Sequence, residues 1–423
     1  MFKSVYKVFV IFLFLCNSLL AQGLPTANPE HVGLSSQRLE QLKNTIAQYV
    51  EDNKIAGVVA LVARHGQTAF VEPIGMQDIE LKKPMNKNTI MRIASMTKAV
   101  TIVAVMMLYE EGHFLLNDPV SMYIPEFDSM KVIVESTTVK DSIIAAERPI
   151  TIYHLLTHTA GFSYPWNQNV GQSYEKEKIS AGINYLDETL SESMKRLAKI
   201  PLVHQPGEKW EYGYSTDVLG YLVEIISGQS LSDFFHERIF KPLKMVDTYF
   251  YLPDEKASRI ATIYGYTFSE GLVKQPKHFT AYNLEFAPYY PNDNRSSYYS
   301  GGGGLCSTVL DYSRFLQMLL NGGQLDGVRL LSRKTVELMT ADHLKDKYNS
   351  GGFGFGFFIN QDLSDMKRPG SIGTYGWGSV YFGSYFVDPQ EQIVAILLGQ
   401  LVPDQNIDLI RKFYVSIYQA IDD

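Results

Sequence analysis

Ser95 and Lys98 lie three residues apart in the tetrapeptide Ser-Met-Thr-Lys, and together they could carry out nucleophilic catalysis without a histidine. Side chains at positions i and i+3 of a helix share one face, so the Lys98 amine can reach the Ser95 hydroxyl. A hydroxyl is a weak nucleophile until an adjacent base accepts its proton. A lysine among apolar neighbours can have its pKa lowered enough to act as that base. The pair therefore predicts a serine that is activated by an amine.

The Ser-x-x-Lys pattern occurs four times, and the surrounding sequence selects one of them. Ser4 lies in a leader segment, Ser173 in a polar stretch that predicts a solvated loop, and Ser364 in a polar stretch before a Pro-Gly turn. Ser95 instead precedes residues 97–111, whose apolar side chains nearly surround a predicted helix. The partial positive charge of that helix N-terminus favours an oxyanion near Ser95.

Strands are predicted near both ends of the chain and helices between them. We therefore expect an α/β (α+β) fold in which an antiparallel sheet is flanked by helices and carries an all-helical insertion. Residues 22–112 and 300–423 would form the α/β part, and 113–299 the mostly helical part with a Tyr-, Pro- and Gly-rich loop over 280–304. The predicted strands are 57–63, 68–71, 354–359, 380–387 and 392–398, and the predicted helices are 35–49 with Ser36 as N-cap, 97–111, 153–157, 188–198, 218–226, 231–239 and 409–421.

Residues 1–21 are typical of an export signal, with a basic start, an apolar run over 8–15 and small residues ending at Ala21. The apolar run is shorter than the ~20 residues that a membrane-spanning helix needs, which disfavours a retained anchor. A lipid anchor at Cys16 is the alternative, although bulky apolar residues precede it. We expect a periplasmic or secreted protein.

The composition limits both the covalent cross-links and the partners of the chain. After cleavage only Cys306 would remain, so no intramolecular disulfide can form. A net charge of −7 without a basic stripe argues against nucleic acid and anionic membrane surfaces, and 45% hydrophobic residues suffice for a large core. A small-molecule substrate is expected, and the sequence indicates no particular oligomeric state.

Four motifs recur in a fixed order along the chain. They cover residues 91–98, 151–161, 206–212 with 217–220, and 377–379 with 388–389. These motifs resemble those of the serine β-lactamase-like family, which comprises class C β-lactamases, D-Ala-D-Ala peptidases and related carboxylesterases. The resemblance extends from about residue 28 to the C-terminus. It implies an acyl-serine mechanism at Ser95, and we expect no cofactor.

The family's second motif is a tyrosine on a loop, and the resemblance places it at Tyr212, counting back from Asp217-Val-Leu-Gly. Tyr214, which is followed by a serine, is the competing candidate. A phenol has a pKa near 10 and acts as a base only beside a stabilising cation, for which Lys98 is the candidate. Tyr212 would accept the Ser95 proton directly or through Lys98, and pass it to the leaving group.

The third motif of β-lactamases and peptidases is Lys-Thr-Gly on a strand, and Trp377-Gly378-Ser379 stands in the matching place. Tryptophan and glycine supply no positive charge for a substrate carboxylate. The backbone can still contribute, because an N–H of Val380 or Ser379 and that of Ser95 could form an oxyanion hole.

Other chemistries have weaker signals. His154 and His158 have the i, i+4 spacing of zinc ligands, but no His-Glu-x-x-His pattern is present, and we expect no metal. No Gly-x-Ser-x-Gly elbow supports a Ser-His-Asp triad. Aromatic residues that could line an acyl pocket are Phe162, Tyr164, Trp166, Tyr289, Tyr290, Tyr298 and Tyr299.

The sequence therefore favours an exported serine hydrolase that acts on short acyl esters. A β-lactamase or D-amino-acid peptidase is the alternative, with another residue holding the substrate carboxylate. A catalytically silent protein that binds a peptidoglycan fragment is the alternative from another class.

Overall fold

The computed structural model describes most of the chain after the predicted leader. Ser4, Cys16 and Ala21 lie outside the described residues. No helix in the described part is long and apolar enough to cross a bilayer. The described ranges are 23–134, 142–292, 297–345, 351–405 and 407–423.

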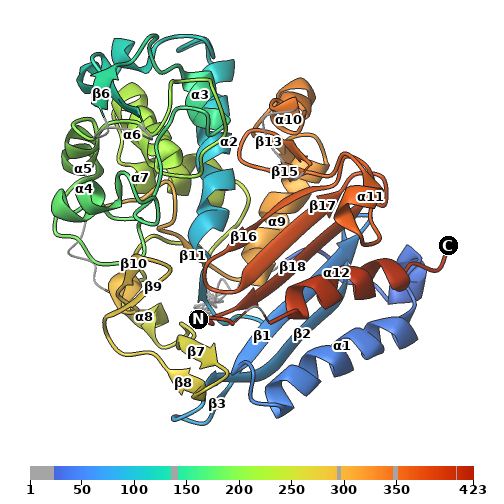
Figure 1. Cartoon of the computed structure of the whole chain (residues 1–423). Coiled ribbons are helices and arrows are strands. Elements are labelled where there is room, and N and C mark those ends of the chain that lie inside the picture. The colour runs from blue at the N-terminus through green and yellow to red at the C-terminus, as the bar shows by residue number, and fades with distance from the viewer. Residues whose placement is uncertain (1–22, 135–141, 293–296, 346–350, 406) are drawn as a thin grey trace, which may run out of the picture.

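The core of the fold is an eight-stranded antiparallel sheet in the order β14-β15-β16-β17-β18-β1-β2-β3 (Figure 1). The two ends of the chain meet at its centre, where Val59 of β1 stands opposite Leu398 of β18. The expected antiparallel sheet is thus confirmed. Its strands are β1 (Gly57–Arg64), β2 (Gln67–Asp78), β3 (Lys83–Pro84), β14 (Gly352–Phe353), β15 (Phe358–Ile359), β16 (Tyr375–Ser379), β17 (Gly383–Asp388) and β18 (Ile393–Gly399).

Helices cover both faces of this sheet, which explains why β1 and β18 are nearly continuous apolar runs. α1 (Ser36–Glu51) and α12 (Leu409–Gln419) lie together on one face and bury their apolar stripes against it (Figure 1). α9 (Val309–Leu320) packs on the other face, where the core continues into the helical part. α9 was not predicted.

α2 (Thr97–Glu110) runs through the boundary between the sheet and the helical part. Every residue from Thr97 to Leu108 is buried, as the apolar pattern predicted. α6 packs directly on α2. The remaining helices are α3 (Ile152–Leu156), α4 (Gly171–Lys176), α5 (Leu190–Leu197), α6 (Ser215–Ser227), α7 (Leu231–Phe235), α8 (Asp254–Ala257), α10 (Arg333–Met339) and α11 (Leu363–Met366).

The middle of the chain is not all-helical, which corrects that part of the expectation. It holds three antiparallel pairs of short strands, several of which are rich in β-branched or aromatic residues that favour strands. These are β5 (Lys131–Val134) with β6 (Ser142–Ala145), β7 (Tyr264–Thr267) with β8 (Gly271–Lys274), and β9 (Phe279–Ala281) with β10 (Leu284–Phe286), while the short pairs β4 (Met91–Arg92) with β11 (Cys306–Ser307) and β12 (Gln324–Leu325) with β13 (Val328–Arg329) lie elsewhere.

Several predicted boundaries also differ. The strand expected over 380–387 begins at Gly383, because a turn occupies 380–382. Of the strand expected over 354–359, only Phe358–Ile359 forms (β15), because residues 354–357 are the connection between β14 and β15. Ser35, rather than Ser36, caps α1 by accepting a hydrogen bond from the Arg38 N–H.

The competing Ser-x-x-Lys sites occupy short surface helices. Ser173 lies in α4 rather than in the predicted loop, and Ser364 lies in α11. Lys176 and Lys367, their lysine partners, are exposed to solvent, so neither is desolvated.

Candidate active site

Ser95 lies in a 3₁₀ turn, η2 (Ala94–Met96), that leads directly into α2. Ala94 adopts a φ of +37°, a backbone conformation that favours glycine. Strained backbone of this kind persists only where the surrounding structure holds it in place. Ser95 is partly exposed between the buried residues Ala94 and Met96, so its hydroxyl is presented at the surface of a cavity.

Lys98 is one helical turn after Ser95, and its side chain is only 1% exposed. Its Nζ donates to the Gly302 carbonyl oxygen at 2.7 Å and to the Tyr164 hydroxyl at 3.2 Å. The distance from Lys98 Nζ to Ser95 Oγ is 3.5 Å, which a small adjustment would shorten to a proton-transfer distance. The predicted neighbours on one helix face are therefore brought together at the site.

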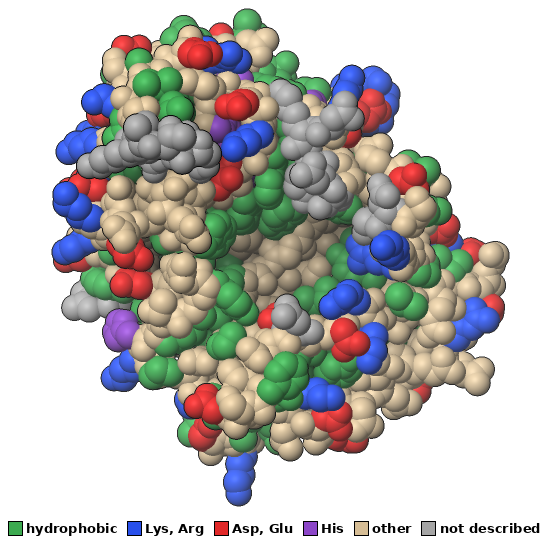
Figure 2. Space-filling model, viewed as in Figure 1, with side chains coloured by type: hydrophobic (Ala, Val, Ile, Leu, Met, Phe, Trp, Pro, Cys, Tyr) green, Lys and Arg blue, Asp and Glu red, His purple; other side chains and the backbone are tan. Residues whose placement is uncertain are grey.

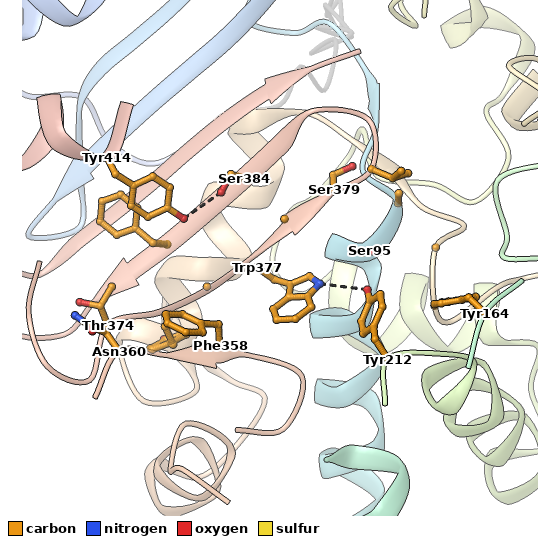
Figure 3. Close-up of a pocket in the computed structure, with 18 of the residues that line it drawn as sticks. Ser95, Tyr164, Tyr212, Phe358, Asn360, Thr374, Trp377, Ser379, Ser384 and Tyr414 are labelled. Carbon is orange, nitrogen blue, oxygen red and sulfur yellow. Dashed lines mark hydrogen bonds between the residues drawn. The ribbon is translucent and has the colours of Figure 1, made fainter. Parts of the chain in front are cut away.

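Tyr212 lies over Lys98, whose Nζ is 4.7 Å from the centre of the phenol ring. Trp377 of β16 donates its indole N–H to the Tyr212 hydroxyl at 3.2 Å (Figure 3). The Tyr212 ring is stacked against Trp210 on one side and Trp166 on another, with interplanar angles of 20° and 4°. Packing and one hydrogen bond thus hold this hydroxyl at the cavity.

Tyr214 is fully buried and does not line the cavity of Ser95. Its hydroxyl donates to the Ile179 carbonyl oxygen at 3.0 Å, and burial raises the pKa of Tyr214 well above its usual value. The geometry therefore places Tyr212, and not Tyr214, with Ser95 and Lys98.

Tyr164 is a residue that the sequence suggested only as one of several pocket aromatics. It is 4% exposed, and its hydroxyl accepts the hydrogen bond from Lys98. Burial, together with the nearby Asp217 carboxylate, raises the pKa of Tyr164 well above its usual value, so this phenol remains protonated. No spacing rule distinguishes Tyr164 among the 27 tyrosines of the chain.

Asp217, the acidic residue of Asp217-Val-Leu-Gly, positions the backbone that contacts Lys98. Its Oδ1 accepts from the Ser300 hydroxyl at 2.5 Å and from the Gly302 N–H at 3.1 Å. The Gly302 carbonyl is the acceptor for Lys98, so a single residue, Gly302, links the acid to the amine. Burial raises the pKa of Asp217, and the Lys98 charge partly offsets that effect.

The two histidines that could have suggested a metal have separate environments. His154 accepts from the Thr151 N–H in the capping box of α3. His158 is buried 5.1 Å from the Tyr212 ring, and burial beside Lys98 lowers the pKa of His158 to about 3. In the described ranges no group of three potential metal ligands gathers.

The end of β16 lies against the turn that holds Ser95. Ser379 is its last residue, and Val380 stands in the turn that follows rather than in a strand. Both line the cavity with Ser95, as do Trp377 and Gly378. The four residues predicted for the oxyanion and substrate pocket therefore line one cavity with Ser95.

The cavity has a volume of about 550 Å³ and opens between the sheet and the helical part. Figure 2 shows it as a hollow with hydrophobic side chains along its walls. Of the seven aromatic residues suggested for an acyl pocket, only Tyr164 and Trp166 line it. Phe162 instead packs in the core against Phe127.

Comparison with known proteins identifies the family of this chain. The Beta-lactamase family model matches residues 42–414. The chain belongs to the beta-lactamase family. The family match and the likeness to a solved structure confirm the fold class that the motifs predicted.

Three of the most similar proteins illustrate the range of this serine hydrolase family. Esterase EstB of Burkholderia gladioli is 31% identical over 83% of this chain and 87% of that protein. A putative D-alanyl-D-alanine carboxypeptidase of Salmonella agona is 28% identical over 89% of this chain and 85% of its own length. The solved structure of EstCE1, a hydrolase with promiscuous acyltransferase activity, is 28% identical, covers 91% of this chain and 98% of its own, and superposes with a TM-score of 0.78.

Replacing each tyrosine by phenylalanine tests which one acts with Ser95. Tyr212→Phe should lower kcat for a p-nitrophenyl ester by about a hundredfold or more, because it removes a proton-transfer group. Tyr214→Phe should change kcat by less than about tenfold. It should lower the free energy of unfolding by about 1 kcal/mol, because it removes one buried hydrogen bond. Steady-state kinetics and urea unfolding of both variants provide the measurement, and the reverse ranking would show that the tyrosine was misassigned.

Proposed function

We propose that this beta-lactamase-family chain is a carboxylesterase that forms an acyl-enzyme at Ser95 and accepts short acyl esters. The observation that carries the proposal is the place of Trp377, whose indole N–H binds the Tyr212 hydroxyl. An uncharged aromatic side chain therefore borders Ser95 on the strand where a carboxylate-binding cation would otherwise stand. A neutral ester needs no such cation.

Acylation begins with loss of the Ser95 proton. Tyr212 accepts it directly or through Lys98, and Ser95 Oγ attacks the ester carbonyl carbon. The carbonyl oxygen becomes an oxyanion that accepts hydrogen bonds from the N–H groups of Ser95 and of Val380 or Ser379. The same proton then passes to the departing alcohol oxygen, which leaves an acyl-Ser95 ester.

Deacylation reverses these roles. Water takes the place of the alcohol, and the Tyr212 and Lys98 pair accepts its proton while the water oxygen attacks the acyl carbon. Collapse of the second tetrahedral intermediate returns the proton to Ser95 Oγ and releases a carboxylic acid. Tyr164 stays protonated throughout and holds the Lys98 amine in position.

Substrate comparison with Ser95→Ala tests the proposal. Wild-type protein should hydrolyse p-nitrophenyl acetate and butyrate with a burst of p-nitrophenol, and Ser95→Ala should lower kcat/KM by at least about a thousandfold. Ser173→Ala, which alters another Ser-x-x-Lys serine, should behave as wild type. Equal turnover by Ser95→Ala and wild type would contradict the mechanism.

The second candidate is a β-lactamase or D-amino-acid peptidase, and one feature favours it. Arg368 lines the same cavity and could hold a substrate carboxylate. Faster hydrolysis of nitrocefin or a D-alanyl amide than of the short esters would replace the esterase proposal. A purified protein that a fluorophosphonate probe fails to label would instead support a silent peptidoglycan-binding protein.

We also infer that the chain is exported, with residues 1–21 removed. The support is the leader-like pattern in the sequence. Expression in a Gram-negative host with its native leader should yield periplasmic protein whose N-terminal residue is Gln22. Protein that partitions into membranes and carries lipid on Cys16 would instead establish the lipoprotein alternative.

A further inference from the structure

The cavity of Ser95 continues into a second compartment on the α12 side of β16, lined by glycine backbone. Gly376 and Gly378 stand opposite Phe386 and Ser384 of β17, so all four belong to the same face of the sheet. A side chain at Gly378 would meet only the Gly383 carbonyl oxygen, at 3.4 Å. At Gly376 an added Cβ would instead meet the Tyr385 carbonyl oxygen at 2.2 Å, so the space beside the strand is open at Gly378 and closely packed at Gly376.

The far compartment combines aromatic walls, such as Phe358 and Tyr414, with several polar groups (Figure 3). The hydroxyls of Ser384 and Tyr414 are hydrogen-bonded to each other at 3.0 Å. Asn360 is 3% exposed; its amide nitrogen donates to the Ser371 carbonyl, and its Oδ1 has no partner among the described residues. A buried unpaired acceptor in a cavity wall costs free energy that a ligand donor can recover.

Arg368 brings a positive charge to this compartment. Its guanidinium lies 3.8 Å from the centre of the Tyr414 ring, a stacked position that restricts its motion. Within the described ranges Arg368 forms no ion pair, so its fork of N–H donors is available to a ligand. The neighbouring buried carboxylate, Asp388, is already bonded to the hydroxyls of Tyr418 and Thr374.

The position of the compartment relative to Ser95 indicates which part of a substrate it holds. The departing alcohol must lie near Tyr212 and Lys98, which supply its proton, and these residues lie on the helical side of Ser95. The acyl chain is then free to follow β16. From Ser379 to Tyr375 the strand rises ~13 Å, which corresponds to roughly ten bonds of an extended chain.

We propose that this compartment, defined by Asn360, Arg368, Ser384 and Tyr414, is an acyl-specificity site for a chain that ends in a carboxylate. Arg368 binds the distal carboxylate. Asn360 Oδ1 would accept a hydrogen bond from an O–H or N–H group near the distal end of the chain. Short esters occupy only the Ser95 end, and an anionic acyl chain of medium length occupies both ends. This inference rests on the proposed ester hydrolysis at Ser95.

Matched pairs of esters test it. The substrates are mono-p-nitrophenyl esters of adipic, suberic and sebacic acid, compared with the neutral hexanoate, octanoate and decanoate. Wild-type kcat/KM should favour the anionic member at the longer lengths, and Arg368→Gln should lower the anionic-to-neutral ratio by about tenfold or more, mainly through KM. Lys367→Gln, the same charge change on the exposed neighbour, should keep the wild-type ratio, and Arg368→Lys should retain part of it.

A binding measurement separates this inference from the proposed function. Suberate should bind to Ser95→Ala protein in isothermal titration calorimetry, and Arg368→Gln in that background should weaken binding about tenfold or more. This result needs no turnover, so it holds or fails whether or not Ser95 is acylated. Equal ester ratios in wild type and Arg368→Gln, or suberate binding that is absent or unaffected by the substitution, would overturn the inference.

Discussion

The site depends on one buried amine. Removing an ammonium group from water costs several kcal/mol unless the protein supplies well-placed acceptors. Lys98 receives the Gly302 carbonyl, the Tyr164 hydroxyl and the face of the Tyr212 ring as substitutes for water. These three groups come from segments that are far apart in the sequence, and they converge on the start of α2.

The fold meets that demand because α2 is buried on all sides from Thr97 to Leu108. Its buried residues share one hydrophobic core with strands of the sheet, and the helix packs on α6, which carries Asp217 at its first turn. Asp217 in turn holds Gly302 against Lys98. β16 of the sheet borders the cavity on the side away from α6. The cavity therefore forms where the sheet and the helical part meet, which is a usual position for a ligand site.

Local pattern predicted the parts of this arrangement that lie close together in the sequence. Ser95 and Lys98 share a helix, and their proximity follows from its periodicity. Tyr164 could not be predicted, because it reaches Lys98 through packing across 66 residues. The strand expected over 380–387 was wrong at its start because Phe382 adopts a φ of +66°, which its aromatic side chain does not signal. Arg368 was likewise missed, since only tertiary contacts bring it to the cavity.

The central claim is that the Lys98 amine activates Ser95. The most direct test is the acylation rate constant of Lys98→Met, measured by stopped-flow with p-nitrophenyl butyrate and checked by the mass of the Ser95 peptide. Methionine fills similar space without a charge, so the fold should persist by circular dichroism. The account predicts a loss of at least about a thousandfold in acylation rate. A folded Lys98→Met protein that acylates Ser95 within about tenfold of the wild-type rate would contradict it.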